Sequence, residues 1–184
     1  KVPTPQPSTP GACAGAVREV IGHFGWDGPV GITVPAVVTN GTVRSAANID
    51  AGWVGTDANE LFTSTLDRPV TVLNDADAAG LAEDRYGAGR DFDGVILLLT
   101  LGTGIGSALI YRGTLVPNTE FGHIEVEGKE AEHRAASSVK DRRGWSYEKW
   151  AGQVSRVFRE YEKLLWPDLI IVGGGISRKA DKWV

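Results

Sequence analysis

Hydrophobic residues recur at helical spacing in two segments of the chain. They follow one face from Ala12 to Phe24, and a stripe of aromatic and aliphatic residues over Tyr147–Leu165 predicts the longest helix. The segment Asp75–Tyr86 is rich in strong helix formers and predicts a third helix. A glycine or a proline follows each segment within two residues, which is the usual signal for the end of a helix.

Short aliphatic and β-branched runs predict the strands. Val30–Val34 is typical of a buried strand, and the continuous apolar run Val95–Leu101 (VILLLTL) is typical of a strand buried on both faces. A glycine-rich turn follows it, and Ser107–Tyr111 is the expected return strand of a hairpin. Further strands are expected over Thr42–Ala47, Pro69–Leu73 and Leu169–Val172. Helices and strands mixed in this way predict an α/β protein.

Composition and charge exclude several classes of protein. The chain has 184 residues and a net charge of −4, which argues against a nucleic-acid-binding face. Cys13 is the single cysteine, so a disulfide framework and a cysteine-based zinc site are excluded, and a cytoplasmic protein is expected. No apolar run reaches the roughly 18 residues that a membrane span requires, so no membrane partner is expected.

The segment Lys1–Pro10 contains four prolines and predicts a connector, because proline lacks a backbone donor and keeps its predecessor extended. Since the chain opens on this connector and contains no methionine, we expect a segment of the protein upstream of Lys1. A boundary between two lobes is expected near Leu73–Asp75, where an apolar strand ends on polar residues.

A glycine-rich turn is the first candidate for chemistry. Its glycines let backbone amides approach an anion closely, and its threonines add hydroxyl donors. The residues are Thr100, Gly102, Thr103, Gly104 and Gly106. The alternative is a tight hairpin with no ligand. A dinucleotide fold does not fit, because a strand pattern rather than a helix follows the glycines.

The pair Asn74-Asp75 lies at the end of an apolar strand. A carboxylate at this place can accept a proton from a substrate hydroxyl, although Asp75 could instead cap the helix that follows. A second polar group is Glu120 with His123 and the glutamates after it, which could hold a polyol or a metal or form a solvated acidic surface. His23 and His133 are expected at the surface without such neighbours.

Two more features could bind phosphate. Gly173–Gly175 follows a strand, and its alternative is a flexible turn. The second is a basic cluster, which could equally be a solvated face: Lys140, Arg142 and Arg143, with Lys129 and Arg134 before them.

The order of these features resembles the repressor/open-reading-frame/kinase (ROK) family of sugar kinases. They are Asn-Asp at a strand end, Thr-x-Gly-Thr-Gly-x-Gly, Glu-x-Gly-His and a triple glycine after a strand. Within the family, the chain is similar to the polyphosphate-using branch in the runs LNDADAAGLAEDRYGAG, PNTEFGH, GKEAEHRAASSVK and GGGISRKADKW.

The resemblance implies an actin-like ATPase (ribonuclease H-like) fold of two lobes, incomplete at both ends. Residues 1–73 would be the small lobe without its first phosphate loop, and residues 74–184 the large lobe without its C-terminal helices. The implied activity is phosphoryl transfer, with Mg²⁺, from inorganic polyphosphate or ATP to the 6-hydroxyl of glucose, and possibly of mannose, by a homodimer. These residues alone are expected to be inactive. A strictly ATP-dependent hexose kinase and a non-catalytic sugar sensor are the alternatives.

The resemblance also assigns the site residues. Asp75 would be the general base and would contact the sugar, and Gly173, Gly174 and Gly175 would border the donor channel. The other sugar contacts would be Asn48, Asn74, Glu120, His123 and Glu132, and the phosphate contacts Thr100, Gly102, Thr103, Gly104 and Gly106. Lys129–Arg134 lacks the family's cysteines, so no zinc is expected. Pro35-Ala36 replaces the family's Pro-Gly, which would reduce backbone freedom beside the sugar.

Overall fold

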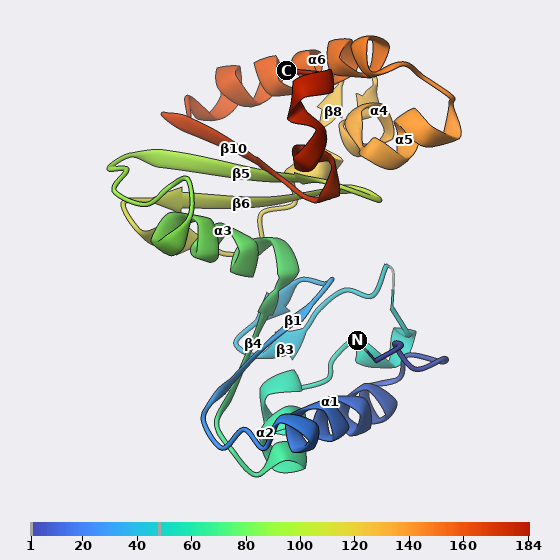
Figure 1. Ribbon diagram of the computed structural model, residues 1–184, viewed down its shortest axis with the longest axis vertical. Helices are drawn as coiled ribbons and strands as arrows, with labels where there is room; N and C mark the ends of the chain where they lie inside the picture. The colour runs from blue at the N-terminus through green and yellow to red at the C-terminus, as the bar shows by residue number, and fades with distance from the viewer. Residues whose placement is uncertain (1, 48) are drawn as a thin grey trace. The chain divides into compact units, whose positions relative to one another are not determined.

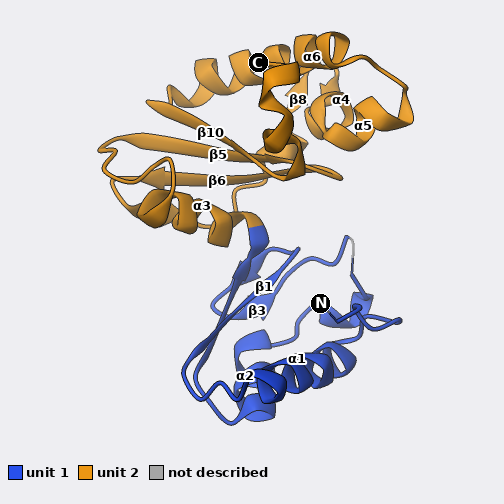
Figure 2. Ribbon diagram, in the orientation of Figure 1, with its two compact units in different colours: residues 1–75 blue, residues 76–184 orange. Residues whose placement is uncertain are grey.

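A computed structural model describes residues 2–47 and 49–184 and divides into two compact units, Lys1–Asp75 and Ala76–Val184 (Figure 2). The division lies next to the strand end at which the sequence places a lobe boundary. Among the described residues, no helix has both the length and the apolar character needed to cross a membrane.

Unit 1 contains a two-stranded parallel sheet with helices packed against it. Strands β1 and β4 pair from Val30 opposite Val70 to Val34 opposite Asn74. A short antiparallel hairpin, β2–β3, turns at Asn40-Gly41, where both residues have positive φ as a two-residue type I′ turn requires. The elements are α1 (Pro10–Phe24), β1 (Val30–Val34), β2 (Val38–Thr39), β3 (Thr42–Val43), η1 (Ala51–Trp53), α2 (Ala58–Leu66) and β4 (Val70–Asn74).

The core of unit 1 joins the two helices to the sheet. Its largest fully buried side chain is Phe62 of α2, which lies 6.1 Å, centroid to centroid, from the ring of Trp53. Helix α1 begins at Pro10 after Thr9, whose hydroxyl accepts from the Ala12 amide, and ends at Gly25 in the left-handed conformation.

Unit 2 is built on a four-stranded sheet in the order β10-β5-β6-β7, in which β10 runs parallel to β5 and the other neighbours are antiparallel. Its elements, with α3 beginning at the boundary, are α3 (Asp75–Tyr86), β5 (Val95–Leu101), β6 (Ile105–Tyr111), β7 (Thr114–Val116), η2 (Phe121–His123), β8 (Glu125–Val126), β9 (Lys129–Glu130), α4 (Glu132–Ala135), α5 (Ser137–Arg142), α6 (Tyr147–Leu165), β10 (Leu169–Gly173) and η3 (Gly175–Lys182).

Helices cover both faces of this sheet, α3 on one and α6 on the other (Figure 1). Along β5, Ile96 and Leu98 belong to the core on the α3 side, whereas Leu97, Leu99 and Leu101 belong to the core that contains Trp150 of α6. This division explains why the run is continuously apolar, and it confirms the expectation of a strand buried on both faces.

Two sequence-based expectations need correction in unit 1, and one helix was not expected. Strand β1 exists over Val30–Val34 but is not buried, since only Val34 lies in the core and its neighbours alternate in exposure. In this two-stranded sheet β1 pairs with β4 on one side. Its alternating exposure is therefore that of a half-exposed strand. The strand expected over Thr42–Ala47 is limited to Thr42–Val43. Helix α2 was not predicted, although Asp57 and Glu60 mark its start as cap and third residue.

Candidate functional site

Asn74 and Asp75 connect β4 to α3. Asn74 is the last residue of β4, is 9% exposed, and donates from Nδ2 to the carbonyl oxygen of Ala36 at 3.1 Å. This bond ties the segment after β1 to the end of β4, at the place where alanine replaces the family's glycine. Asp75 is exposed and is the first residue inside α3, whereas a side-chain cap usually precedes the helix. An exposed carboxylate fixed at a strand end can act as a proton acceptor. Asn48, the other sugar contact expected in this unit, lies outside the described residues.

The glycine-rich turn joins β5 to β6, so the expected hairpin is confirmed. Its carbonyl groups are held by the start of α5: Ser138 donates from its amide to Gly102 O at 3.1 Å and from Oγ to Thr103 O at 2.6 Å. In a planar trans peptide the N–H points opposite to the C=O. The amides of Thr103 and Gly104 therefore point away from α5, which leaves them suitably directed for an anion.

Glu132 of α4 lies against this turn. Its Oε2 accepts from the Ile105 amide at 3.4 Å, and a Cβ built on Gly104 would collide with the same oxygen. The absence of a side chain at Gly104 thus leaves room for the Glu132 carboxylate in this position. At Gly106 a Cβ would lie 2.6 Å from Thr100 Oγ1 and 3.0 Å from Ala76 Cβ, so this glycine is required by close packing.

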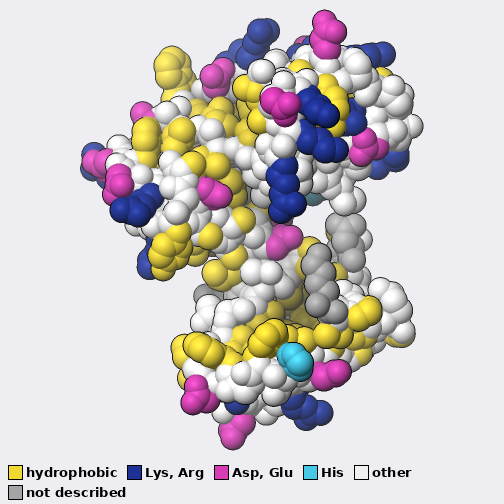
Figure 3. Space-filling view, viewed as in Figure 1, with side chains coloured by type: hydrophobic (Ala, Val, Ile, Leu, Met, Phe, Trp, Pro, Cys, Tyr) yellow, Lys and Arg dark blue, Asp and Glu magenta, His cyan; other side chains and the backbone are white. Residues whose placement is uncertain are grey.

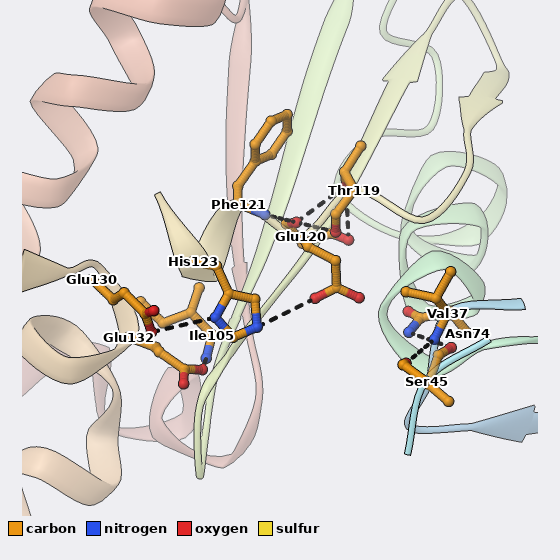
Figure 4. Close-up of polar contacts among 12 residues, drawn as sticks. Val37, Ser45, Asn74, Ile105, Thr119, Glu120, Phe121, His123, Glu130 and Glu132 are labelled. Carbon is orange, nitrogen blue, oxygen red and sulfur yellow. Dashed lines mark hydrogen bonds and ion pairs between the residues drawn. The ribbon is translucent and has the colours of Figure 1, made fainter. Parts of the chain in front are cut away.

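Carboxylates surround the imidazole of His123, as Figure 4 shows. Its Nε2 lies 3.9 Å from Glu120 Oε2, and its Nδ1 lies 3.4 Å from Glu130 Oε2. The side chains of Glu120, His123 and Glu130 are 44%, 57% and 43% exposed, so each of these contacts is weak by itself. Exposed acceptors and donors at this spacing are suited to binding the hydroxyl groups of a polyol.

His133 corrects the expectation that it has no such neighbours. It is a surface residue, but its Nδ1 lies 3.5 Å from Glu130 Oε2 and its Nε2 lies 3.8 Å from Glu132 Oε1. Glu130 was not singled out from the sequence as a site residue. The hairpin β8–β9 brings it back to His123 through a turn at Glu127-Gly128, where both residues have positive φ, and the glycine was the only sign of this turn in the sequence.

The short helix η2 carries His123 and is fixed from the interior. Tyr161 of α6 donates its hydroxyl to Phe121 O at 2.9 Å, and burial raises the pKa of Tyr161 well above the usual value. Ser107 Oγ accepts from the Phe121 amide at 3.0 Å. Any Cβ at Gly122 would collide with the carbonyl oxygen of Ile105. The glycine of Glu-x-Gly-His is therefore needed for η2 to approach β6.

A divalent metal is a second ligand that this group could take. His123, Glu130 and Glu132 offer ligand atoms that all lie within 4.8 Å of one another. Imidazole and carboxylate donors suit zinc as well as a polyol. The expectation of no zinc therefore stays a prediction.

The triple glycine lies beside the glycine-rich turn. Strand β10 ends at Gly173, which pairs with Thr100 of β5, and η3 begins at Gly175. Gly174 has φ 86°, and a Cβ there would lie 3.2 Å from Leu101 O, so this position requires glycine. The two glycine segments meet at one edge of the sheet, as a shared phosphate site would require.

Two of the five residues in the predicted basic cluster, Lys129 and Arg134, lie in or against the β8–β9 hairpin and not in α5. Arg134 is 15% exposed and donates to the carbonyl oxygens of Val126 and Glu127 at 2.7 Å each, so it holds the β8–β9 hairpin. Lys129 lies in β9 itself. Lys140, Arg142 and Arg143 remain together at the end of α5.

Comparisons with known proteins agree with this arrangement. The model of the ROK family matches residues 1–137. A polyphosphate glucokinase of Mycobacterium tuberculosis is 62% identical over 185 residues, which cover 100% of this chain and 70% of that protein.

Two solved structures share the fold. An inorganic polyphosphate/ATP-glucomannokinase from an Arthrobacter species superposes with a TM-score of 0.91 at 48% identity and covers 100% of this chain and 75% of the other. A ROK family glucokinase from Streptomyces griseus in complex with glucose and AMPPNP superposes with a TM-score of 0.81 at 25% identity, over 97% and 75% of the two chains. The chain belongs to the ROK family and has that family's α/β, actin-like fold.

Proposed function

We propose that this chain carries the sugar-binding and phosphate-binding residues of a glucokinase that uses inorganic polyphosphate or ATP, with mannose as a second acceptor. The observation that carries the proposal is the position of Glu132. Its Oε1 lies 3.8 Å from His133 Nε2, and its Oε2 accepts from the Ile105 amide at the end of the glycine-rich turn, whose amides suit a phosphate. A kinase for a polyol needs these two kinds of group next to each other. The whole-chain likeness to a polyphosphate glucokinase supports the choice of substrates.

Each residue has a defined task in the proposed reaction. Glu120, His123 and Glu132 hold hydroxyl groups of the sugar, with Asn74 contributing its amide. Asp75 takes the proton of the 6-hydroxyl as the sugar oxygen bonds to the terminal phosphorus. The bond from that phosphorus to its bridging oxygen breaks, and the shortened polyphosphate or ADP leaves with the electron pair. Such a transfer depends mainly on alignment and electrostatic support.

The loop amides of Thr103 and Gly104 would supply part of that electrostatic support. Mg²⁺ would arrive with the donor as its phosphate complex, because phosphate oxygens are ligands that it prefers, and would neutralise developing charge. Gly173–Gly175 would let the donor lie close to the backbone beside the turn.

The donor and the product test the proposal. The full-length protein carrying this sequence should convert glucose to glucose 6-phosphate with polyphosphate and with ATP, detected by ³¹P nuclear magnetic resonance. Turnover with ATP but not with polyphosphate would instead indicate a strictly ATP-dependent hexose kinase. Glucose binding without turnover on either donor would indicate a sugar sensor and refute the proposal.

The resemblance to the family also motivates the proposal of a homodimer in the cytoplasm. The lone, half-buried Cys13 is consistent with a reducing compartment. Sedimentation equilibrium at the working concentration should give twice the mass of the chain, and a single-chain mass would reject the dimer.

A further inference from the structure

We propose that a basic face of unit 2 binds the part of a polyphosphate donor that lies beyond its reacting end. This inference rests on the proposed kinase function. The basic face is formed by the end of α5, the start of α6 and η3, and its side chains are Lys140, Arg142, Arg143, Lys149, Lys179 and Lys182. Figure 3 shows Lys and Arg side chains gathered over this part of the unit.

The face concentrates positive charge in a chain that is acidic overall. Residues 137–149 and 175–184 carry seven basic and three acidic side chains, whereas the whole chain has a net charge of −4. The acids are Asp141, Glu148 and Asp181. Asp141 is 73% exposed and bonds to Lys140 Nζ at 2.7 Å; that bond, with Lys179 nearby, holds the pKa of the carboxyl below its usual range. A local excess of cations within an acidic molecule is suited to a polyanion.

Two aromatic rings hold four of these cations in place. The Arg143 guanidinium lies 5.0 Å and Lys149 Nζ 5.3 Å from the centroid of Trp145. Lys140 Nζ and Lys182 Nζ lie 4.6 Å and 5.8 Å from the centroid of Tyr147. Long basic side chains lose conformational entropy when a ligand fixes them. Cations already stacked on rings lose less, so the face is partly preorganised for binding.

The two segments that form the basic face, residues 137–149 and 175–184, both start beside the glycine-rich turn. Helix α5 begins with Ser137 and Ser138, which bond to the carbonyl groups of Gly102 and Thr103, and Arg142 Nη1 donates to Ser138 Oγ at 3.3 Å. The segment η3 begins directly after Gly174, which packs against Leu101. Arg143 follows Ser137 by six residues, a rise of roughly 9 Å at 1.5 Å per helical residue, so the cations of the basic face begin a short distance from the glycine-rich turn.

This continuity distinguishes the two donors. A long polyphosphate carries negative charge along its whole length and can occupy the turn and the basic face together. In ATP the negative charge is confined to three phosphates, and a nucleoside follows them. The basic face should therefore contribute more to the binding of long polyphosphate than to the binding of ATP.

The test compares donors in the full-length protein carrying Arg143→Ala, Lys182→Ala or both. Because a hydrogen bond to a charged group is typically worth enough for a tenfold change in affinity, the double variant should raise the KM for long-chain polyphosphate at least about tenfold more than the KM for ATP. Tripolyphosphate should behave like ATP. The KM for long polyphosphate should also rise with salt, with a smaller slope in the variant.

Matched variants separate this site from general effects of charge. Lys163→Ala removes an equally positive, exposed residue at the far end of α6 and should leave both donor KM values unchanged. Arg143→Lys keeps the charge and should retain most of the binding. Equal changes for ATP and polyphosphate, or an unchanged polyphosphate KM in the double variant, would overturn the proposal. If the unmodified protein showed no turnover with either donor, the proposed function would be refuted instead.

Discussion

At the scale of residues, Glu120 and His123 of one sequence motif lie close together, but the motif did not show all of their neighbours. Glu120 and His123 meet because they are three residues apart, with Glu120 directly before η2 and His123 at its end. Glu130 and His133 join them only because a two-residue hairpin reverses the chain. Local spacing could not show this reversal without the positive φ values at Glu127 and Gly128. Motif residues were therefore predictable, and residues brought in by a turn were not.

Glu132→Gln tests the carboxylate that contacts both parts of the site. The amide keeps an acceptor for the Ile105 N–H but loses the charge that strengthens bonds to sugar hydroxyls. We expect the Kd for glucose, measured by titration calorimetry, to rise about tenfold. Glu125→Gln, an exposed carboxylate of β8, is the matched control and should change little. Equal glucose affinity in the two variants would remove Glu132 from the sugar site.

Tyr161→Phe tests how η2 is held. Loss of the bond to Phe121 O should lower the free energy of unfolding by about 1–2 kcal/mol. Burial raises the pKa of the folded-state phenol, so folding stabilises its neutral form. This stabilisation is complete below about pH 10, where unfolded tyrosine begins to ionise, and falls above it.

Denaturant titrations of both proteins from pH 8 to pH 11 provide the check. The advantage of the unmodified protein over Tyr161→Phe should shrink toward the top of that range. An advantage that stays constant or grows there would mean that the hydroxyl is not buried as described.

At the scale of elements, the sequence predicted best the segments with a strong local signal: helix-forming residues in α3, a continuous apolar run in β5 and a periodic apolar stripe in α6. Helices α3 and α6 and strand β5 span the predicted residues, because their apolar positions face cores on known sides. Helix α2 was missed, since its nine residues give only a short periodic signal. Strand β1 was wrongly expected to be buried, because apolar composition does not show how many neighbours a strand has.

Alanine substitutions at two helical glycines should change the free energy of unfolding in opposite directions. A Cβ on Gly80 of α3 would lie 2.5 Å from Ala108 Cβ in β6, so Gly80→Ala should destabilise unit 2 by about 1–3 kcal/mol. Around Gly152 of α6 no described atom outside its own helix and chain neighbours lies within 4 Å of a new Cβ. Gly152→Ala should stabilise by about 0.5–1 kcal/mol through helix propensity. Urea unfolding measures both, and a change of the same sign would contradict the described packing of α3.

At the scale of the whole molecule, the two-unit division agrees with the end of β4, where polar residues follow an apolar strand. Each unit has its own core: the buried hydrophobic residues of unit 1 lie between Ala14 and Val72, and those of unit 2 begin at Ala76. The family's fold could be predicted from the order of the motifs along the chain, and not from the periodicity of hydrophobic residues. Strand order, in particular β10 beside β5, depends on contacts between distant segments that no local pattern encodes.

Phe62→Ala tests whether the cores are separate. Removing this fully buried ring should cost unit 1 about 3–5 kcal/mol. Hydrogen exchange should then accelerate at the amides of β1 and β4, while those of β5 keep their protection. Equal acceleration in β5 would show that the two units unfold together.

Asp75→Asn in the full-length protein tests most directly whether Asp75 is the base of a glucose-phosphorylating site. The variant keeps the shape of the side chain but cannot accept the proton. General base catalysis is typically worth a factor of about 10² to 10⁴. We predict a fall in kcat of that size with both donors, while the Kd for glucose changes less than about threefold. A variant that binds glucose and retains the original kcat would contradict the account.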